Sequence, residues 1–531
     1  MSDKYINPSG LAHYDEKIKE VIDGKADALY YDEQNSELQL KSGENVLSTV
    51  TIGGGSGGGG ITPNNVSDIN LKTGNTKLTI AWSDPSDTII EGQTLSTWKG
   101  TKLVQKVGSF PANPKDGTLI LDNQVRDKYK TNGFEITGLT NGETYYFALF
   151  PYSDTGAVNT NVANRVSGTP QAYRKMTAVI DLSNSNPATS VTYADDATGM
   201  INGSDAWDDF FGHYPVLFKD GTEVGKLNPN NFTQFEDGSP ADISSGEAGD
   251  VMVAFPKRGL KISTANNKVT ISMTDDPNAE GFTYYAHTKG STSKDKFYIG
   301  AYLGTLVSNA LRSVSGSTPL ANKTIGNFRT YAKNRGTGYS QFGFYQLVFI
   351  QCMYLLKYKS TDSQTALGRG FVDGNSEATT TGQTNAKGMD YGETTGKYQM
   401  KLFGIEDLWG NLRQWIDGLF CDSSYNVCTS TNPDNFNDTG SGYNKYASGN
   451  TANVGGWMSE PIGSSECGFC IKASNGSATT YFSDYSNLYA GCLPYFGGGW
   501  SSASYAGIFS LSVGYSASDA YASLGARLMY L

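Results

Sequence analysis

Histidine, the side chain best suited to acid/base chemistry near neutral pH and a common metal ligand, is rare in this sequence. His13, His213 and His287 are the only histidines, and each stands alone in its segment. Since each is alone in its segment, no histidine-based triad or metal site is predicted, and we expect each to be a surface residue or a satisfied structural residue. Glu406 and Asp407 are adjacent, and carboxylates that cap the start of a helix explain them better than an acid/base pair.

The six cysteines lie between positions 352 and 492, and one pair has the spacing of a metal or redox site. Cys467-Gly-Phe-Cys470 has no second pair and no nearby histidine, so we expect buried thiols, with zinc or redox chemistry as the alternative. Residues 434–440 carry oxygen ligands at alternate positions but lack the distal glutamate of a calcium loop. An ordered turn is expected there, with calcium as the alternative, and no other cofactor or metal is predicted.

The composition predicts a globular chain of two to four domains. Its 531 residues carry a formal net charge of −11, and no region clusters Lys and Arg as nucleic-acid binding requires. The N-terminus has no apolar core after a basic start, which argues against a secretory signal peptide. The most apolar run, residues 342–356, is too short to cross a bilayer and predicts a buried helix instead of membrane insertion.

Residues 1–60 are predicted to form a β-rich N-terminal docking segment that ends in a flexible linker. Leu11, Tyr14, Ile18 and Val21 recur at three- and four-residue spacing, the pattern of an amphipathic helix or of about two coiled-coil heptads. Short β-prone stretches separated by turns follow this stripe. The segment then closes with a run of glycines interrupted by one serine, which acts as a tether.

Residues 61–170 contain short alternating segments at regular spacing, the pattern of an all-β, immunoglobulin-like sandwich. Trp82 is followed by Ser-Asp-Pro, and Leu139 is followed six residues later by Tyr145. These features resemble the core tryptophan and the tyrosine corner of fibronectin type III domains. The resemblance implies a spacer module without chemistry of its own.

Residues 171–531 show helical patterns only near 325–334 and 341–358, which predicts a small β core, two helices and many ordered loops. The segment 403–418, FGIEDLWGNLRQWIDG, resembles the G-x-x-D-x-x-G-N-V-W-E-W segment of the formylglycine-generating-enzyme branch of the C-type lectin fold. Residues 365–370 and the closing 524–528 are similar to the same family. The resemblance implies an α+β, C-type-lectin-like C-terminal domain.

Within that segment, Gly410 and Asn411 are expected to end a short helix and turn the chain, after which Trp415 and Ile416 enter a strand against the core. Enzymes of this branch oxidise a substrate cysteine with a pair of C-terminal cysteines. Since no cysteine follows Cys492, the resemblance implies a non-enzymatic use of the fold. An enzyme of the formylglycine-generating type is the alternative.

Residues 481–531 scatter tyrosines among Ser, Ala and Gly, with few ionisable groups, a composition typical of binding surfaces. An irregular Gly/Ser-rich core is the alternative. The stretch from Trp500 to Leu528 resembles the variable region of proteins diversified by retroelements, as in phage tail adhesins. Scrambled Asn codons cannot give Lys, Glu, Gln or Met, and none of these occurs between Tyr481 and Arg527. Trp500 is expected to be a fixed frame residue.

Periodicity separates frame positions from contact positions in this stretch. Phe509, Leu511 and Val513 alternate with small residues, which predicts a strand with one face on the core, and residues 524–529 alternate likewise. The outward or loop positions expected at the contact surface are Ser501, Ser502, Tyr505, Ser510, Ser512, Gly514, Tyr515, Asp519, Tyr521 and Ser523. A further upstream set comprises Tyr485, Asn487, Tyr489, Tyr495 and Phe496.

These features predict the receptor-binding protein of a phage or prophage tail. The leader would dock to tail or baseplate proteins, its helical stripe favours a homotrimer, and the hypervariable C-terminal surface would bind a host-cell receptor, protein or glycan. Assembly in the bacterial cytoplasm followed by lysis requires no signal peptide. A bacterial surface adhesin with fixed carbohydrate specificity is a further alternative.

Overall fold

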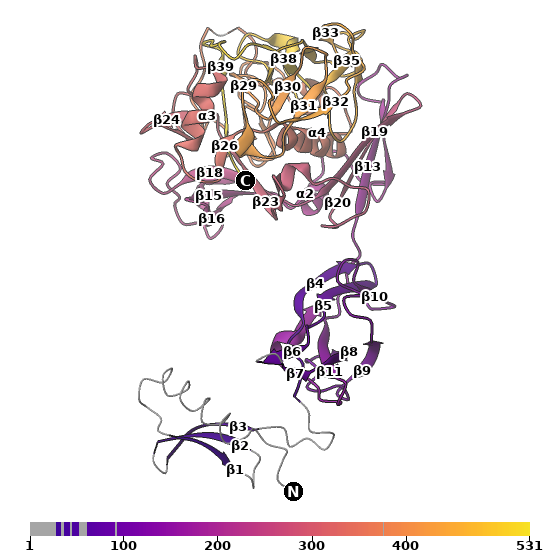
Figure 1. The fold of residues 1–531 in the computed structure, drawn as a ribbon. Helices are drawn as coiled ribbons and strands as arrows, with labels where there is room; N and C mark the ends of the chain where they lie inside the picture. Colours follow the sequence, from indigo (N-terminus) through magenta and orange to yellow (C-terminus); the bar gives the residue numbers. More distant parts are fainter. Residues whose placement is uncertain (1–27, 33–36, 43–44, 52–60, 91–92, 375) are drawn as a thin grey trace. The chain divides into compact units, whose positions relative to one another are not determined.

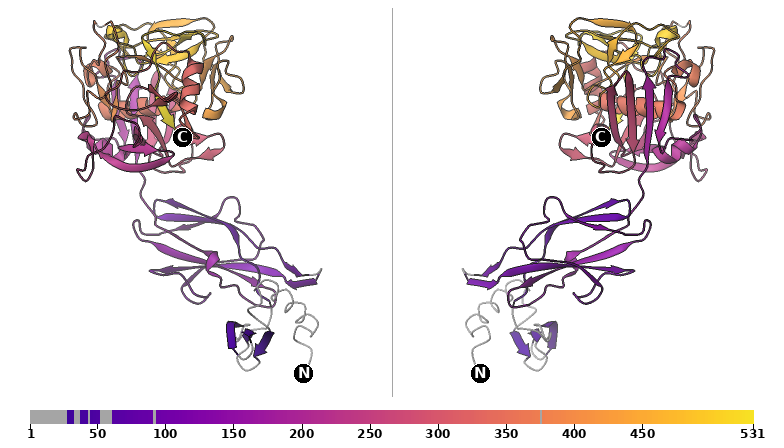
Figure 2. Two further views of the ribbon diagram at one scale, coloured as in Figure 1. Left: turned by 90° about the vertical axis from the view of Figure 1, so that its left-hand side faces the viewer. Right: turned by 90° about the vertical axis from the view of Figure 1, so that its right-hand side faces the viewer.

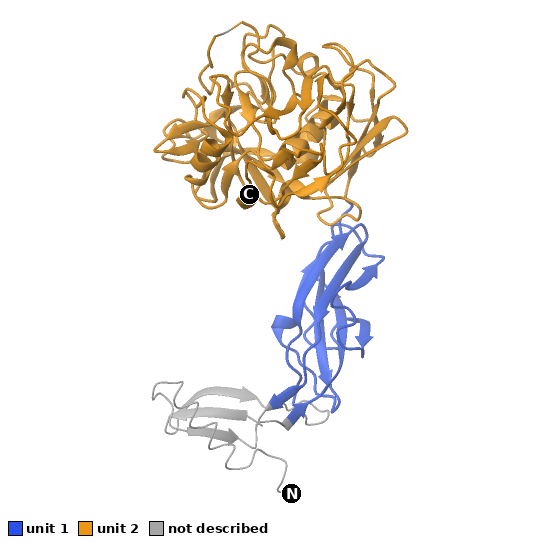
Figure 3. Cartoon of the chain, turned by 45° about the horizontal axis from the view of Figure 1, so that its top comes forward, with its two compact units in different colours: residues 1–172 blue, residues 173–531 orange. Residues whose placement is uncertain are grey.

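The computed structural model describes residues 28–32, 37–42, 45–51, 61–90, 93–374 and 376–531. The chain divides into two compact units, residues 1–172 and 173–531 (Figure 1, Figure 3). Among the described residues of both units, strands dominate and helices are few, which confirms the coarse prediction of a β-rich chain. The predicted helical stripe, the glycine linker and His13 lie outside the described residues.

The first unit begins with a three-stranded antiparallel sheet and continues with two further sheets, ordered β10-β5-β4 and β12-β11-β8-β9. The strands of the first sheet are β1 (Ala28–Asp32), β2 (Glu37–Ser42) and β3 (Asn45–Thr51). Those of the other two are β4 (Ser67–Gly74), β5 (Lys77–Ser83), β8 (Trp98–Val107), β9 (Thr118–Asn123), β10 (Phe134–Thr137), β11 (Tyr145–Ser153) and β12 (Arg165–Gly168). A hairpin of β6 (Thr88–Ile90) and β7 (Gln93–Ser96) and the 3-10 turn η1 (Val162–Asn164) complete this unit.

One hydrophobic cluster joins the sheets β10-β5-β4 and β12-β11-β8-β9, as a sandwich requires. Trp82 is fully buried in it, and its indole N–H donates to Asp84 at 2.9 Å. The Tyr145 hydroxyl accepts the Thr140 N–H at 3.0 Å and donates to Glu143 at 2.7 Å, so it ties down the connection ahead of β11. The finer assignment to the fibronectin type III class stays a prediction.

The second unit contains a four-stranded sheet, β14-β13-β20-β19, and a seven-stranded sheet, β17-β16-β15-β18-β23-β40-β26. The strands of the first are β13 (Lys175–Asp181), β14 (Val191–Asp195), β19 (Gly259–Ala265) and β20 (Lys268–Thr274). Those of the second are β15 (Tyr214–Lys219), β16 (Thr222–Asn228), β17 (Asn231–Phe235), β18 (Asp250–Pro256), β23 (Lys296–Gly300), β26 (Tyr339–Gln341) and β40 (Leu528–Tyr530). Because β40 pairs with β23 on one side and β26 on the other, the last strand is an interior strand of the seven-stranded sheet.

Two helices were predicted in this unit, and both are confirmed as α3 (Ile325–Lys333) and α4 (Phe344–Tyr358). Helix α4 starts three residues later than predicted because Gln341 pairs with Leu528 in the seven-stranded sheet. Nearly the whole helix is buried, and it lies beside β13 (Figure 2). Gln351 donates its amide N–H to the Ile508 carbonyl at 2.8 Å, which satisfies one of its buried polar atoms. No helix in the described part of the chain is both long and apolar enough to span a membrane.

A six-stranded sheet, β33-β36-β38-β37-β29-β39, forms the part of this unit drawn uppermost in Figure 1. Its strands are β29 (Arg413–Trp415), β33 (Val454–Trp457), β36 (Tyr485–Leu488), β37 (Leu493–Phe496), β38 (Leu511–Tyr515) and β39 (Leu524–Gly525). The smaller strands are β21 (Thr288–Lys289), β22 (Thr292–Ser293), β24 (Thr305–Val307), β25 (Ala310–Arg312), β27 (Lys401–Leu402), β28 (Ile405–Glu406), β30 (Leu419–Cys421), β31 (Val427–Thr429), β32 (Asn444–Tyr446), β34 (Glu460–Pro461) and β35 (Ile471–Ala473). The remaining helical turns are α2 (Ala206–Phe211), α5 (Ser363–Ala366), η2 (Tyr285–His287), η3 (Pro433–Asn435) and η4 (Ala503–Tyr505).

The short helix expected ahead of Gly410 is a wrong prediction. Residues 405–406 pair instead with residues 401–402 as the hairpin β27–β28. The turn itself is confirmed, because Gly410 and Asn411 both have positive φ angles of 82° and 59°. Trp415 then enters β29 as expected, and Ile416 is buried just beyond the end of that strand.

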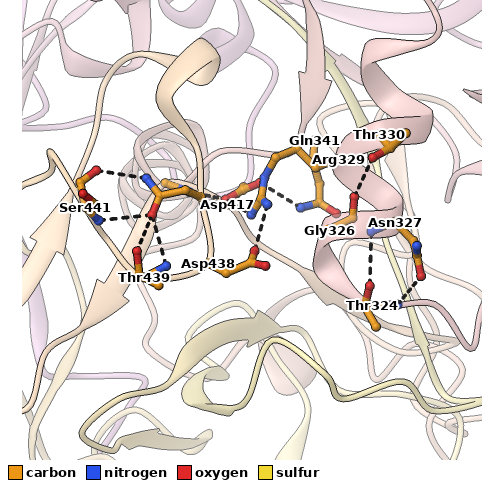
Figure 4. A network of polar contacts seen from close by, with 12 residues as sticks. Thr324, Gly326, Asn327, Arg329, Thr330, Gln341, Asp417, Asp438, Thr439 and Ser441 are labelled. Atoms are coloured by element: carbon orange, nitrogen blue, oxygen red, sulfur yellow. Dashed lines mark hydrogen bonds and ion pairs between the residues drawn. The ribbon is translucent and has the colours of Figure 1, made fainter.

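An ion-pair network fixes helix α3 to the loops around it (Figure 4). Arg329 donates to Asp417 at 2.7 Å and to Asp438 at 2.8 Å, and the Gln341 amide donates to Asp417 at 3.1 Å. Asp438 belongs to the 434–440 segment, where the Asn437 side chain also accepts the Ser441 N–H at 3.1 Å. These bonds form the ordered turn that was expected there.

Candidate functional site

The six-stranded sheet separates the main core from a second, partly exposed face. Leu511 and Val513 of β38 lie in the main hydrophobic core together with Phe496 of β37 and Leu488 of β36. On the other face, Trp415, Leu493 and their neighbours belong to a separate cluster. The alternation predicted for Leu511 and Val513 is therefore confirmed.

Residues opposite one another in this sheet form a row across four strands. Asn487 pairs with Ser512, Ser512 pairs with Tyr495, and Tyr495 pairs with Trp415. Since directly opposite residues share a face of the sheet, this row lies on the side away from the main core.

A bulge at Gly514 brings one more tyrosine to that side. Tyr515 pairs with Leu493, and Val513 pairs with the next residue, Pro494, so Gly514 has no counterpart on β37. Tyr515 consequently shares a face with Ser512, although three positions separate them. A Cβ atom at Gly514 would lie 2.7 Å from the Asn487 side-chain oxygen, so a larger residue would displace the neighbouring amide.

Six aromatic side chains cover this side of the sheet and the adjoining loops, and we call them the aromatic face. They are Trp457, Tyr485, Tyr495, Tyr505, Tyr515 and Tyr521. All are half-buried except Tyr505 and Tyr521, which are 50% and 45% exposed. The face is thus built from rings that are packed on one side and open to solvent on the other.

The rings form two groups. In the first, Tyr505 stacks on Trp457 with ring centroids 4.9 Å apart and an interplanar angle of 13°, and Tyr485 meets Tyr505 edge-on at 5.0 Å. In the second, Tyr495 and Tyr515 stack at 3.9 Å, and Tyr521 lies 5.2 Å from Tyr515. Packing of this kind holds each ring in one orientation before any ligand arrives.

Both groups are anchored to the interior. Tyr515 meets the fully buried Trp415 edge-on at 5.8 Å, and the Trp415 indole donates to the Lys323 carbonyl at 3.2 Å. Tyr505 ends the short turn η4, which the Gln364 amide holds by donating to the Ala503 carbonyl at 2.8 Å. Buried and hydrogen-bonded residues therefore hold the tyrosines of the face in place.

Few charges accompany the aromatic face. Arg413 is half-buried and donates to the Ser523 hydroxyl at 3.0 Å. Asp519 accepts the Ser516 N–H at 2.7 Å and the Tyr521 hydroxyl at 3.0 Å, and the latter bond raises the pKa of Tyr521. Asp484 is fully buried below the sheet, where burial raises the pKa of its carboxyl well above the usual range. Asp484 therefore does not contribute a charge to the surface of the aromatic face.

Arg527 and its four hydrogen-bond acceptors form a buried polar cluster beneath the sheet, which we call the hub. Arg527 is fully buried and donates to the Gln414 side chain at 2.8 Å and to the carbonyls of Gly300, Glu406 and Asp407 at 2.9, 2.7 and 3.1 Å. Burial lowers the pKa of Arg527 to about 10, so the guanidinium keeps its charge at neutral pH. The hub ties the closing segment to the 403–418 segment and to β23.

The interpretation of Glu406 and Asp407 as helix caps is wrong. Both carboxyls are buried, and burial is the main cause that raises their pKa values. Glu406 accepts N–H bonds from Gly382 at 2.7 Å and Thr384 at 2.9 Å, whereas Asp407 accepts one from Asn411 at 2.7 Å. Their role in the structure is to hold loops, at positions sealed from solvent.

The predicted contact residues fall into three groups. Exposed are Ser501, Tyr505 and Tyr521. Half-buried are Gly514, Tyr515, Asp519, Ser523, Tyr485, Tyr489 and Tyr495. Buried, against the predicted outward placement, are Ser502, Ser510, Ser512, Asn487 and Phe496.

Each buried member has a physical reason for its position. Ser502 accepts the Gly499 N–H at 2.8 Å, and Ser510 donates to the Tyr485 carbonyl at 3.0 Å. Ser512 and Asn487 both lie on the predicted side of the sheet. Ser512 is buried between the larger Asn487 and Tyr495 on adjacent strands, and Asn487 lies between Gly455 and Ser512. Phe496 pairs with Leu511 and faces the main core. The burial of these five residues could not be predicted, because alternation along one strand does not reveal what the flanking strands cover.

Trp457 was not predicted to belong to the aromatic face, and the prediction that Trp500 is a frame residue was wrong. Trp457 lies well ahead of the tyrosine-rich stretch and joins the face only because β33 pairs with β36, with Trp457 opposite Tyr485. No local sequence pattern predicts this pairing of β33 with β36. Trp500, expected to be a frame residue, is only half-buried, and the fully buried tryptophans nearby are Trp409 and Trp415.

The cysteines and the described histidines are mostly buried. The six cysteines are free thiols; five are buried, including Cys467 and Cys470 as expected, and Cys492 is half-buried. His213 and His287 are buried, and burial lowers their pKa values to about 4 and about 3. Within the described ranges, no group of three His, Cys, Asp or Glu side chains is arranged to hold a metal ion.

No family model matches this chain, and no curated protein matches it. The solved structures that align with it include those titled Major Tropism Determinant P3c Variant and Major Tropism Determinant U1 Variant. Each is 12% identical, over 96% of this chain and 95% of that chain, with a TM-score of 0.19. Likeness at this level does not establish the fold.

Proposed function

We propose that this chain is the receptor-binding protein of a phage or prophage tail and that the aromatic face binds a host-cell surface receptor. One observation carries the proposal: Tyr505 and Tyr521 are about half exposed, yet their rings are packed against other rings of the face. Pre-oriented aromatic rings lose little conformational freedom on binding and dominate the energetics of many interfaces. The scarcity of surface charge suits a contact driven by burial of apolar area.

The buried frame beneath the face fits a surface that tolerates variation. Leu511, Val513 and Arg527 lie in the interior, whereas Tyr505 and Tyr521 are 50% and 45% exposed. We infer that a retroelement diversifies the outward positions and leaves the interior ones constant. Flanking DNA provides a direct test, because a near-copy of the last coding stretch should lie beside a reverse-transcriptase gene and differ at adenines.

Trp457 gives the face a fixed component under this proposal. It lies outside the stretch that resembles a variable region, and it stacks on Tyr505, which lies inside it. Sister sequences should therefore keep Trp457, Leu511 and Val513 while they vary at Tyr505 and Tyr521. Equal variation at interior and outward positions would contradict diversification of the surface.

The rest of the assembly follows from the same proposal. The N-terminal segment would dock to tail or baseplate proteins as a homotrimer, and the sandwich would act as a spacer. Several copies on one particle would raise the avidity by about 10² to 10⁴ without new contacts. A modest affinity at each aromatic face would then suffice for adsorption.

Binding of the fluorescently labelled full-length chain to a panel of bacterial strains tests the proposal. The double variant Tyr505→Ala/Tyr521→Ala should lose binding to the strain that the wild-type chain recognises. Tyr398→Ala is the matched control, because Tyr398 is 56% exposed but is no part of the aromatic face. Full binding by the double variant, or equal loss in the control, would overturn the assignment of the face.

A further inference from the structure

Two cysteines from distant parts of the chain lie directly opposite each other. Cys421, the last residue of β30, forms an antiparallel bridge with Cys492, which immediately precedes β37. The Cys421 N–H donates to the Cys492 carbonyl at 3.1 Å, and the Gly491 N–H donates to the Cys421 carbonyl at 2.8 Å. Gly491 has a φ of 73°, so it is the extra residue of a bulge, and Cys492 is the residue that faces Cys421.

The two side chains also point to the same side. Cys421 is a fully buried member of the main hydrophobic core, and Cys492 is partly buried against that core. Residues opposite each other in an antiparallel pair have Cβ atoms about 4.5–5.5 Å apart. A disulfide takes Cβ atoms about 3.5–4.5 Å apart, so a small shift of two adjacent strands brings the thiols into bonding range.

We propose that Cys421 and Cys492 are a disulfide-forming pair, oxidised when the protein leaves the reducing cytoplasm. The bond would join β30 to the start of β37, three residues ahead of Tyr495. It would therefore fix one edge of the aromatic face and remove freedom from the long loop between the two cysteines in the unfolded chain. Exposure to an oxidising medium rests on the proposed function, whereas the pairing itself does not.

The other thiols are placed less well for this reaction. Cys428 pairs with Phe420 and packs in a small cluster with Phe436, on the opposite side of the hairpin from Cys421. Cys467 and Cys470 are both buried, and their backbones are joined by a turn with a 3.2 Å hydrogen bond. Cys492 is the half-buried thiol among the six, so it is the one that a soluble oxidant reaches first.

The oxidation balances with a small-molecule disulfide such as oxidised glutathione. The Cys492 thiolate attacks one glutathione sulfur, the glutathione S–S bond breaks, and one glutathione thiolate leaves. The Cys421 thiolate then attacks the Cys492 sulfur and displaces the second glutathione. The two cysteine protons end on the two glutathione thiols, and the pair loses the two electrons that the glutathione disulfide gains.

Burial affects the rate of this reaction. It raises the pKa of Cys421 to about 12 and raises that of Cys492 above its usual value. Few thiolates are present at neutral pH, and the rate of bond formation should increase about tenfold per pH unit while the pH stays below both values.

Peptide mapping of the folded, full-length chain tests the pairing. Protein purified with a reductant is incubated with oxidised glutathione, and its disulfide-linked peptides are identified by mass spectrometry. Trypsin leaves Cys421 and Cys428 in one peptide, since no Lys or Arg lies between Arg413 and Lys445. Chymotryptic cleavage after Tyr425 separates them. We expect one dominant link, Cys421 to Cys492, and four remaining free thiols.

Thermal unfolding supplies the second readout. The oxidised wild-type chain should melt several degrees above the reduced chain, and Cys492→Ser should abolish this gain. Cys428→Ser is the matched control and should keep both the link and the gain. A dominant link from Cys421 to Cys428 or from Cys467 to Cys470, or no link in the folded oxidised chain, would overturn the proposal. Failure of the wild-type chain to bind any bacterial strain would refute the proposed function and leave the pairing intact.

Discussion

Replacement of Arg527 by Met tests whether the buried hub holds the aromatic face in place. Methionine fills much of the volume of the arginine stem but donates no hydrogen bond. Four acceptors would lose their donor: the Gln414 side-chain oxygen and the carbonyls of Gly300, Glu406 and Asp407. All four are buried by the closing segment and its neighbours, so water cannot readily replace the guanidinium.

The size of the effect follows from the number of these acceptors. An unpaired buried acceptor costs about 1–3 kcal/mol, so four of them reduce the free energy of unfolding by at least about 4 kcal/mol. Whole domains are stable by about 5–15 kcal/mol. Arg527→Lys keeps the charge but has three donors on a single atom, and it should lose roughly 1–3 kcal/mol because at least one acceptor stays unpaired.

Urea unfolding followed by tryptophan fluorescence measures both variants. Arg413→Met is the matched control, because Arg413 is half-buried and makes one 3.0 Å bond to the Ser523 hydroxyl. The control should lose less than about 1 kcal/mol. If Arg527→Met is no less stable than the control, the hub does not support the sheet and the reasoning fails.

Three further predictions concern groups near the core and the face. The unfolded chain takes up a proton at a histidine pKa of about 6.5, and burial lowers the pKa of His213 to about 4, so acid destabilises the native state. The stability of His213→Phe relative to wild type should thus increase by about 1.4 kcal/mol per pH unit from pH 6.5 down to 4, measured by urea unfolding; a constant difference would contradict this. Tyr515→Ala should lower the free energy of unfolding by about 2–4 kcal/mol and Tyr505→Ala by under about 1.5 kcal/mol, since only the former ring packs on buried Trp415. Trp500→Ala should leave the domain folded in a thermal scan, because Trp500 is half-buried.

Features that depend only on residues close together in the chain could be predicted from the sequence. Helix α4 follows from one apolar run, and the inward positions Leu511 and Val513 follow from two-residue alternation. The turn at Gly410 and Asn411 follows from the residue types that tolerate positive φ. In each case the physical cause acts within about one turn or one strand.

Features that depend on distant partners could not be predicted in this way. Ser512 lies on the predicted side of its strand, yet it is buried because Tyr495 and Asn487 flank it on neighbouring strands. Arg527 is separated from Gly300 by most of the second unit, and no local pattern shows that the two residues meet. Trp457 joins the aromatic face through strand pairing alone.

Tyrosine labelling of the chain on its host cell tests the central claim most directly. A tyrosine-specific reagent is applied to the free chain and to the chain bound to cells, and the modified positions are compared by mass spectrometry. Tyr505 and Tyr521 should be modified in the free chain and protected on the cell, whereas Tyr398 should be modified equally in both. Unchanged modification of Tyr505 and Tyr521 on cells that retain the bound chain would contradict the account.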